Sequence, residues 1–86
     1  MEHKPDIHQV LRVFDRITRD GVRRDDGSWQ LAGLTARADV DGYTVVIDDD
    51  LCRISVFFHN AYDLDFPDTI ALEQFLDRLK AVDNKP

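Results

Sequence analysis

Residues 34–59 read LTARADVDGYTVVIDDDLCRISVFFH, and their alternation of apolar and polar side chains predicts half-buried strands. The dipeptide Asp41-Gly42 suits a two-residue type I′ hairpin, because both turn positions need positive φ. Folding the chain there places Ala38 opposite Val45. The first two segments of the stretch are therefore predicted to be antiparallel strands.

A second reversal is marked by Asp48-Asp49-Asp50-Leu51, which we read as a solvated turn. Pairing of Ile47 with Cys52 beyond this turn adds a third strand. One face of the three strands then collects the apolar side chains Leu34, Ala36, Ala38, Val40, Tyr43, Val45, Ile47, Cys52, Ile54, Val56 and Phe58. A one-residue slip would turn all of them toward water, so the alternation specifies the register strongly.

Amphipathic helices are predicted on both sides of these strands. Residues 6–20 have apolar side chains at helical spacing, with Asp6 as N-cap and Gly21 as a left-handed residue after the end. A second helix begins at Pro67 or Asp68 and runs to about Val82. The apolar sides consist of Ile7, Val10, Leu11, Phe14 and Ile17 in the first helix, and of Ile70, Leu72, Phe75, Leu76 and Leu79 in the second.

The predicted order of elements is α-β-β-β-α, and each element has one apolar side. We therefore expect an α+β fold in which two helices pack on one face of a three-stranded antiparallel meander. The 86 residues form one domain, residues 1–86, with an ordered core over about 6–82.

Two segments do not fit the regular pattern. Trp29 and Leu31 are apolar in an odd phase, whereas the apolar residues after Gly33 are even. This conflict predicts a bulge or bend at Gly33. Residues 59–66 are read as irregular.

The net charge of −6 is unevenly distributed. Residues 1–24 carry six Lys and Arg against four acids, and the remaining residues carry five against thirteen. An acidic surface supports solubility and disfavours nucleic acid as a partner. The single Cys52 cannot form an intrachain disulfide, and no apolar run suggests a signal peptide or a membrane span. We therefore expect a cytoplasmic protein that does not bind membranes.

The basic exception is the first helix, where Arg12, Arg16 and Arg19 share one side and Arg23 and Arg24 follow. Such a row could follow a phosphate backbone. Interleaved aspartates dilute the row, and no exposed aromatic side chain is available among the arginines to stack on bases. A solvated, salt-bridged helix face is the favoured interpretation.

The face of the sheet opposite the helices is the predicted functional surface. Val46 and Phe57 are apolar there, although an exposed antiparallel face is usually polar. The predicted partner-contact residues are Arg37, Thr44, Val46, Arg53, Ser55, Phe57 and His59, with Val46 opposite Arg53 and Thr44 opposite Ser55. Two interpretations remain open. The face contacts another chain or a small ligand, or residues 29–31 or 60–66 fold over it.

A calcium loop is suggested by the spacing of Asp39, Asp41 and Asp48. Arg37 stands where the first ligand is needed, and the flanking segments are strands rather than helices. The spacing therefore predicts no calcium site.

Other candidates for chemistry have simpler structural roles. The oxygen-rich set Asn60, Asp63, Asp65 and Asp68 is suited to loop solubility and helix capping. His59 lies near carboxylates and could transfer protons, but no nucleophile motif or phosphate loop accompanies it. Cys52 points inward in the predicted phase and is read as an inert thiol. We predict no catalytic residue, no cofactor and no metal site.

The motifs Asp41-Gly42-Tyr43-Thr44-Val45 and Phe58-His59-Asn60-Ala61-Tyr62 resemble those of a family of short bacterial proteins that forms a domain of unknown function. The resemblance covers the chain from Val10 to about Leu79. It implies a small bacterial cytoplasmic protein and assigns no functional residue.

The sequence therefore favours a non-enzymatic module for protein interaction or self-association that acts through its sheet. Its partner would be another protein or a second copy, and two exposed edge strands also permit strand addition. One alternative is an acidic regulator that occupies the basic, nucleic-acid-binding surface of a partner. A less favoured alternative is a small-ligand enzyme that uses His59.

Overall fold

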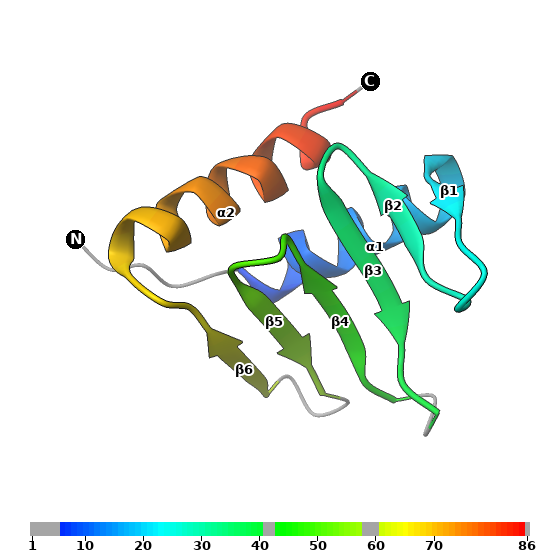
Figure 1. Cartoon of the computed structure of the whole chain (residues 1–86), viewed down its shortest axis with the longest axis horizontal. Coiled ribbons are helices and arrows are strands. Elements are labelled where there is room, and N and C mark those ends of the chain that lie inside the picture. The colour runs from blue at the N-terminus through cyan, green and yellow to red at the C-terminus, as the bar shows by residue number, and fades with distance from the viewer. Residues whose placement is uncertain (1–5, 41–42, 58–60, 86) are drawn as a thin grey trace.

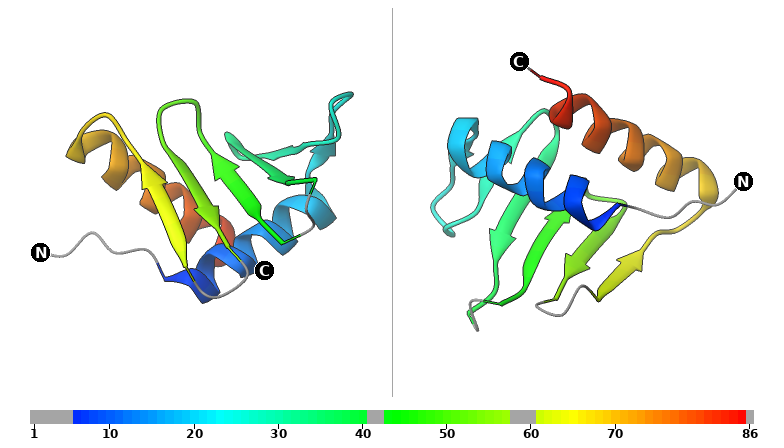
Figure 2. Two further views of the ribbon diagram at one scale, coloured as in Figure 1. Left: turned by 90° about the horizontal axis from the view of Figure 1, so that it is seen from below. Right: turned by 180° about the vertical axis from the view of Figure 1, so that it is seen from behind.

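The computed structural model describes residues 6–40, 43–57 and 61–85. Its elements are α1 (Ile7–Asp20), β1 (Val22–Arg23), β2 (Trp29–Leu31), β3 (Leu34–Ala38), β4 (Val45–Asp48), β5 (Arg53–Val56), β6 (Tyr62–Asp65) and α2 (Thr69–Asp83). Each strand pairs antiparallel with its neighbour in sequence, so the six strands form one meander (Figure 1). Both helices lie on the same face of this sheet (Figure 2).

The α+β class, the antiparallel sheet and the two helices are confirmed, but the prediction of three strands is wrong. The sheet has six strands because β1 and β2 extend it beyond β3 and β6 extends it beyond β5. These added strands are only two to four residues long. An alternation that short is a weak signal of strand structure in a sequence.

The hairpin between β2 and β3 resolves the conflict of phase around Gly33. Ala32 and Gly33 have φ of 53° and 82°, and Leu31 pairs with Leu34 across them. A two-residue turn with both φ values positive is the type I′ geometry. Trp29 consequently pairs with Ala36, so odd residues before the turn and even residues after it share one face. Gly33 therefore bends the chain within a hairpin turn and not within a bulge.

The turn between β4 and β5 is built on a buried carboxylate, so the reading of Asp48-Asp49-Asp50 as solvated is wrong for Asp49, while Asp50 is exposed. Asp49 is 8% exposed, and its Oδ1 accepts hydrogen bonds from the backbone N–H of Leu51 at 3.1 Å and of Cys52 at 2.8 Å. The Asp49 N–H also donates to the Cys52 carbonyl oxygen at 3.1 Å. Asp50 adopts a φ of 82° within this turn.

This turn sets a register that differs from the predicted one by two residues. Ile47 pairs with Ile54 and not with Cys52, and Val45 pairs with Val56. A shift of two residues leaves every side chain on its predicted face, because the strand repeat is also two residues. On the other side of β4, the predicted pairing of Ala38 with Val45 is confirmed. The turn at Asp41-Gly42 lies outside the described residues.

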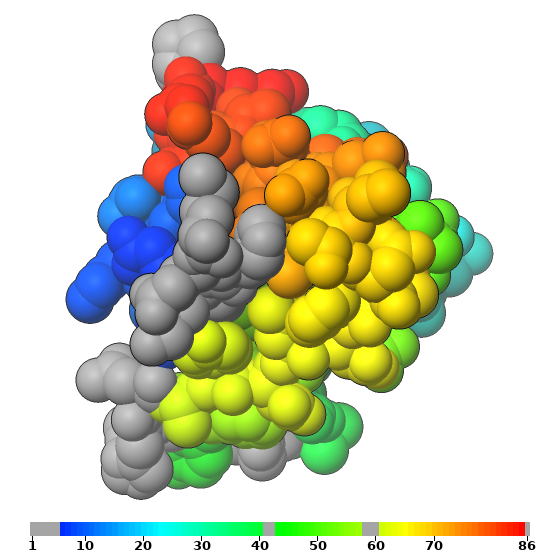
Figure 3. Space-filling model, turned by 90° about the vertical axis from the view of Figure 1, so that its left-hand side faces the viewer, coloured from blue at the N-terminus to red at the C-terminus, as the bar shows by residue number. Residues whose placement is uncertain are grey.

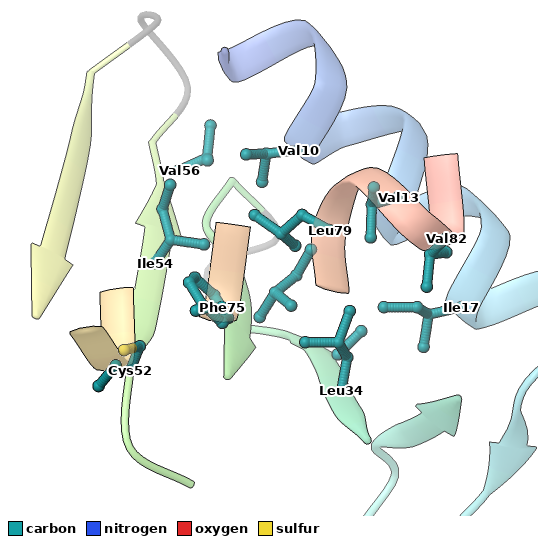
Figure 4. Close-up of a cluster of buried hydrophobic side chains, with 13 residues drawn as sticks. Val10, Val13, Ile17, Leu34, Cys52, Ile54, Val56, Phe75, Leu79 and Val82 are labelled. Atoms are coloured by element: carbon teal, nitrogen blue, oxygen red, sulfur yellow. The ribbon is translucent and has the colours of Figure 1, made fainter. Parts of the chain in front are cut away.

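The core lies between the sheet and the two helices, whose apolar side chains point toward one another (Figure 4). Six members of the predicted apolar face are buried there: Leu34, Ala36, Ile47, Cys52, Ile54 and Val56. They meet Val10, Val13 and Ile17 of α1 and Ala71, Phe75, Leu79 and Val82 of α2. The prediction of a two-layer packing with one shared core is thereby confirmed.

The predicted apolar face is not covered along its whole length. Val40 is fully exposed, Tyr43 is 62% exposed and Ala38 is also exposed, so their predicted burial is wrong. The strands extend past the helices at this end, as the right-hand view in Figure 2 shows. Phe58, also predicted on this face, lies outside the described residues.

Both helices begin at the predicted aspartates. Asp6 Oδ1 accepts from the His8 N–H at 2.9 Å, and Asp68 Oδ1 accepts from the Ala71 N–H at 2.8 Å. Each carboxylate satisfies a backbone N–H that has no partner within its helix. Two residues predicted on the apolar sides are exposed instead, Leu11 at 40% and Ile70 at 69%.

Across the helix pair, Arg12 of α1 binds Asp83 of α2. Its Nε donates to Oδ1 at 2.8 Å and its Nη2 donates to Oδ2 at 3.0 Å. Gln9 also donates a hydrogen bond to Asp83. The bidentate pair fixes the C-terminal end of α2 against α1. Over the three ranges of residues that the structure describes, neither helix is long and apolar enough to cross a membrane.

Gly21 ends α1 with φ −79° and ψ 173°, so its predicted left-handed conformation is wrong. The glycine is required by close packing instead, because an added Cβ would lie within 3.0 Å of the carbonyl oxygens of Ile17 and Gln30. Gly21→Ala should therefore lower the free energy of unfolding by roughly 1–3 kcal/mol, as overpacking does. Urea denaturation followed by Trp29 fluorescence measures this. An unchanged or increased stability would show that only backbone entropy matters at this position.

The Arg12–Asp83 pair predicts a specific dependence of stability on pH. The hydrogen bond from Arg12 lowers the pKa of the Asp83 carboxyl below its ordinary value of 3.8. A native pKa below the unfolded value stabilises the fold above the unfolded pKa, and this stabilisation is lost as the pH falls through the native pKa. Asp83→Asn should reduce stability at neutral pH, and the deficit should shrink between about pH 5 and about pH 2. Asp77→Asn, an exposed position on the same helix, is the control. A deficit independent of pH would contradict the assignment.

Candidate functional site

The sheet face opposite the helices forms the candidate site, and we call it the open face. The strand register arranges its central side chains in two rows, each crossing β3, β4, β5 and β6. The first row is Thr35–Asp48–Arg53–Asp65, and the second is Arg37–Val46–Ser55–Asp63. Within residues 6–40, 43–57 and 61–85, both helices lie on the other side of the sheet, as the left-hand view in Figure 2 shows.

The predicted contact residues of the open face differ in exposure. Arg37 and Arg53 are exposed, Phe57 is 41% exposed and Ser55 is half-buried. Thr44 and Val46 are buried, at 8% and 7% exposed. His59 lies outside the described residues. The accessible part of the predicted surface therefore consists of two guanidinium groups, an aromatic ring and a hydroxyl group.

Val46 is buried although it lies on the open face. It pairs with Arg37 on one side and Ser55 on the other, so its predicted pairing with Arg53 is wrong. Arg53 pairs with Asp48 and Asp65 instead, because of the two-residue shift at the β4–β5 turn. The predicted pairing of Thr44 with Ser55 fails for the same reason. Long polar side chains beside a small apolar one can shield it with their aliphatic stems.

The segments that could have folded over the open face lie in the plane of the sheet. Residues 29–31 form β2, and residues 62–65 form β6 at the opposite edge. Figure 3 shows residues 61–70, in yellow, at the surface along the β6 edge. Strand pairing at the edges therefore replaces the covering that we considered.

Two hollows lie at opposite ends of the open face. One of about 260 Å³ is lined by Arg37, Ala38, Asp39, Val40 and Val46. The other, of about 370 Å³, is lined by Asp48, Asp50, Leu51, Cys52, Arg53 and Asp65. Each contains a guanidinium group and at least one carboxylate. The larger hollow is mainly polar and is suited to polar contact with a macromolecule, whereas Ala38, Val40 and Val46 make the smaller one partly apolar.

The described residues are poorly arranged for binding a metal ion or for thiol chemistry. Among residues 6–40, 43–57 and 61–85, no three His, Cys, Asp or Glu side chains gather closely enough to hold a metal ion. Asp68 caps α2, as predicted, while Asp63 and Asp65 project from β6 on the open face. Cys52 is buried as predicted, and burial raises its thiol pKa, with nearby carboxylates adding to the effect. A raised pKa disfavours the reactive thiolate.

The arginines of the first 24 residues make intramolecular contacts. Arg12 binds Asp83, and Arg19 donates from Nε and Nη2 to Asp20 at 3.1 Å each. The Arg23 guanidinium lies 5.2 Å from the centroid of the Trp29 ring, which is a cation–π geometry. These contacts support the interpretation of a salt-bridged surface over that of a phosphate-binding row.

Several exposed apolar side chains were not among the contact residues predicted from the sequence. Val40, Tyr43 and Tyr62 are exposed at the end of the sheet that passes the helices, and Leu51 is exposed in the β4–β5 turn. Their exposure depends on how far the helices reach along the sheet, and no local pattern encodes that length. They lie outside the central rows of the open face.

The chain belongs to the family described as Protein of unknown function (DUF3081), whose family model matches residues 5–85. This match confirms the resemblance to a family of unknown function. No curated protein matches the chain, and no solved structure does. The family assigns no activity, so the function is argued from the geometry of the site.

The difference in burial between Val46 and Phe57 predicts opposite roles for these two residues. Val46→Ala should lower the free energy of unfolding by roughly 1–2 kcal/mol, because it removes two buried methyl groups. Phe57→Ser should change stability by less than about 0.5–1 kcal/mol, because the ring is partly in solvent. Urea denaturation of both variants provides the comparison. A larger loss for Phe57→Ser would place that ring in the core and remove it from the accessible surface.

Proposed function

We propose that this member of the DUF3081 family is a non-enzymatic protein-interaction module that acts through the open face of its sheet. The observation that carries the proposal is the one-sided helix layer, which, among the described residues, leaves the outer face of β3, β4, β5 and β6 uncovered with an exposed aromatic ring at its margin. Its proposed setting is the bacterial cytoplasm, which is supported by the single cysteine and by the sequence resemblance.

The chemistry of the open face supports protein contact. Aromatic residues and arginine are enriched at protein interfaces and supply most of the binding energy there. Phe57 offers apolar area, while Arg37 and Arg53 are exposed on β3 and β5. No ion pair joins either arginine to another residue within the described ranges. Both guanidinium groups are therefore available to carboxylates of a partner.

A second candidate function is an acidic regulator that binds a basic surface of its partner. It is favoured by the hollow at the β4–β5 turn, where Asp48, Asp50 and Asp65 surround Arg53. Contact would then centre on Leu51, which is 62% exposed at this hollow, and not on Phe57.

A photo-crosslinking amino acid placed at Phe57 tests the proposal directly. On irradiation of the labelled chain in bacterial cells, we expect an adduct of discrete mass, because the open face is occupied by a partner. The same group at Ile70 is the matched control, since Ile70 is an exposed apolar residue on α2 in the opposite layer. It should give no such adduct.

The same photo-crosslinking group, placed at Leu51 in a separate variant, separates the two proposed functions. An adduct from Leu51 and none from Phe57 would favour the acidic regulator. Adducts from Ile70 alone, or no adduct from either sheet position, would contradict the proposed role of the open face. The mass of the adduct from Phe57 distinguishes a second copy of the chain from another protein.

A further inference from the structure

The charges of the open face are arranged so that the face complements itself. In the row that crosses β3 to β6 through Val46, the first residue is the cation Arg37 and the last is the anion Asp63. In the row through Asp48, the two central residues are the anion Asp48 and the cation Arg53. Each row therefore carries opposite charges at positions that are mirrored about the line between β4 and β5.

A two-fold axis parallel to the strands and passing between β4 and β5 uses this arrangement. Such an axis lays β3 of one copy over β6 of the other and β4 over β5. Arg37 then faces the second copy's Asp63, and Asp48 faces the second copy's Arg53. Isologous contact of this kind repeats every pair twice.

The remaining residues of the two rows also face suitable residues of the second copy when it is placed by this axis. Thr35 faces the second copy's Asp65 and can donate a hydrogen bond to it, while Val46 faces Ser55. Aligned sheets cross at about 30°, so the axis would be inclined to the strands by about half this angle and the outer strands would be displaced by a few ångströms. The length of the arginine side chain accommodates such a displacement at Arg37.

A two-fold axis perpendicular to the strands would not give this match. It would exchange the two rows within each strand and place Asp63 over the second copy's Asp65 on β6. Arg37 would face Thr35, and no guanidinium would meet a carboxylate. Like charges set against each other oppose association, so the charge order selects the parallel axis.

We propose that the occupant of the open face is a second copy of this chain, related by a two-fold axis parallel to the strands. The inference rests on the proposed function and names its partner. Of the groups that form the proposed ion pairs, Arg37, Arg53 and Asp63 are exposed and Asp48 is half-buried. The ion pairs described within the chain leave both arginines for this contact.

Charge reversal tests the pairing between copies. Arg37→Asp and Asp63→Arg should each raise the dissociation constant of the dimer roughly tenfold or more, because two attractive pairs become repulsive. Sedimentation across a concentration series at low salt measures this, and added salt should weaken the wild-type dimer. Asp77→Arg makes the same change of net charge as Asp63→Arg on exposed α2 and should leave the dimer unchanged.

Mixing the two reversed variants is the decisive step. A dimer of one Arg37→Asp chain and one Asp63→Arg chain has an attractive pair at both sites, so the mixture should associate as tightly as wild type. Arg37 and Asp63 lie three strands apart within one chain, roughly 14 Å, and cannot pair there. Restoration can therefore arise only between chains. Wild-type chain that stays monomeric, or a mixture that stays dissociated, would overturn the inference. A Phe57 crosslink to a different protein, found with monomeric wild type, would overturn it while leaving the proposed function intact.

Discussion

The buried carboxylate of Asp49 holds the turn that joins β4 to β5. Its Oδ1 accepts two backbone N–H groups of the β4–β5 turn, and its Oδ2 lies 3.5 Å from Nη1 of Arg78 on α2. A buried carboxylate without such partners would be strongly unfavourable. The turn is therefore held in one geometry, which aligns β5 with β4 and ties this end of the sheet to the helix layer.

The composition of the open face follows from that alignment. With Ile47 opposite Ile54, Arg53 stands between two aspartates and Val46 between Arg37 and Ser55. In the register predicted from the sequence, Val46 would have paired with Arg53. Opposite charges would then not have stood at mirrored positions in both rows. A single buried turn residue thus determines which side chains a partner of the open face would meet.

Much of the fold could be predicted from the sequence because strand alternation and helix spacing are local. Asp6 and Asp68 begin the helices as predicted. The side chains of β3, β4 and β5 lie on their predicted sides of the sheet, because the error in the predicted register is a shift of two residues. The burial of Asp49 could not be predicted, since three consecutive aspartates resemble a solvated turn. The exposure of Val40 depends on the reach of the helices, which is a tertiary property.

Two missed strands did leave signals in the sequence. Trp29 and Leu31 change phase relative to Leu34 across two residues, which is the pattern of a two-residue hairpin. In β6, Tyr62 and Leu64 alternate with aspartates, as in a half-buried strand. The mirrored charge rows, in contrast, require the register of four strands at once and could not be obtained from the sequence alone.

Contact of the open face with a second copy, about an axis parallel to the strands, can be measured by paramagnetic relaxation between chains. Ala61 is exposed at the end of β6, and Ala61→Cys can carry a spin label while the buried Cys52 stays unmodified. The labelled chain is mixed with ¹⁵N-labelled wild-type chain, so that any broadening arises between copies. With the axis parallel to the strands, broadening should be centred on the amides of Arg37 in β3 and of Asp39 in the loop that follows β3. Broadening centred on Tyr62 and Asp63, on the helices, or on no residue at all would contradict this prediction.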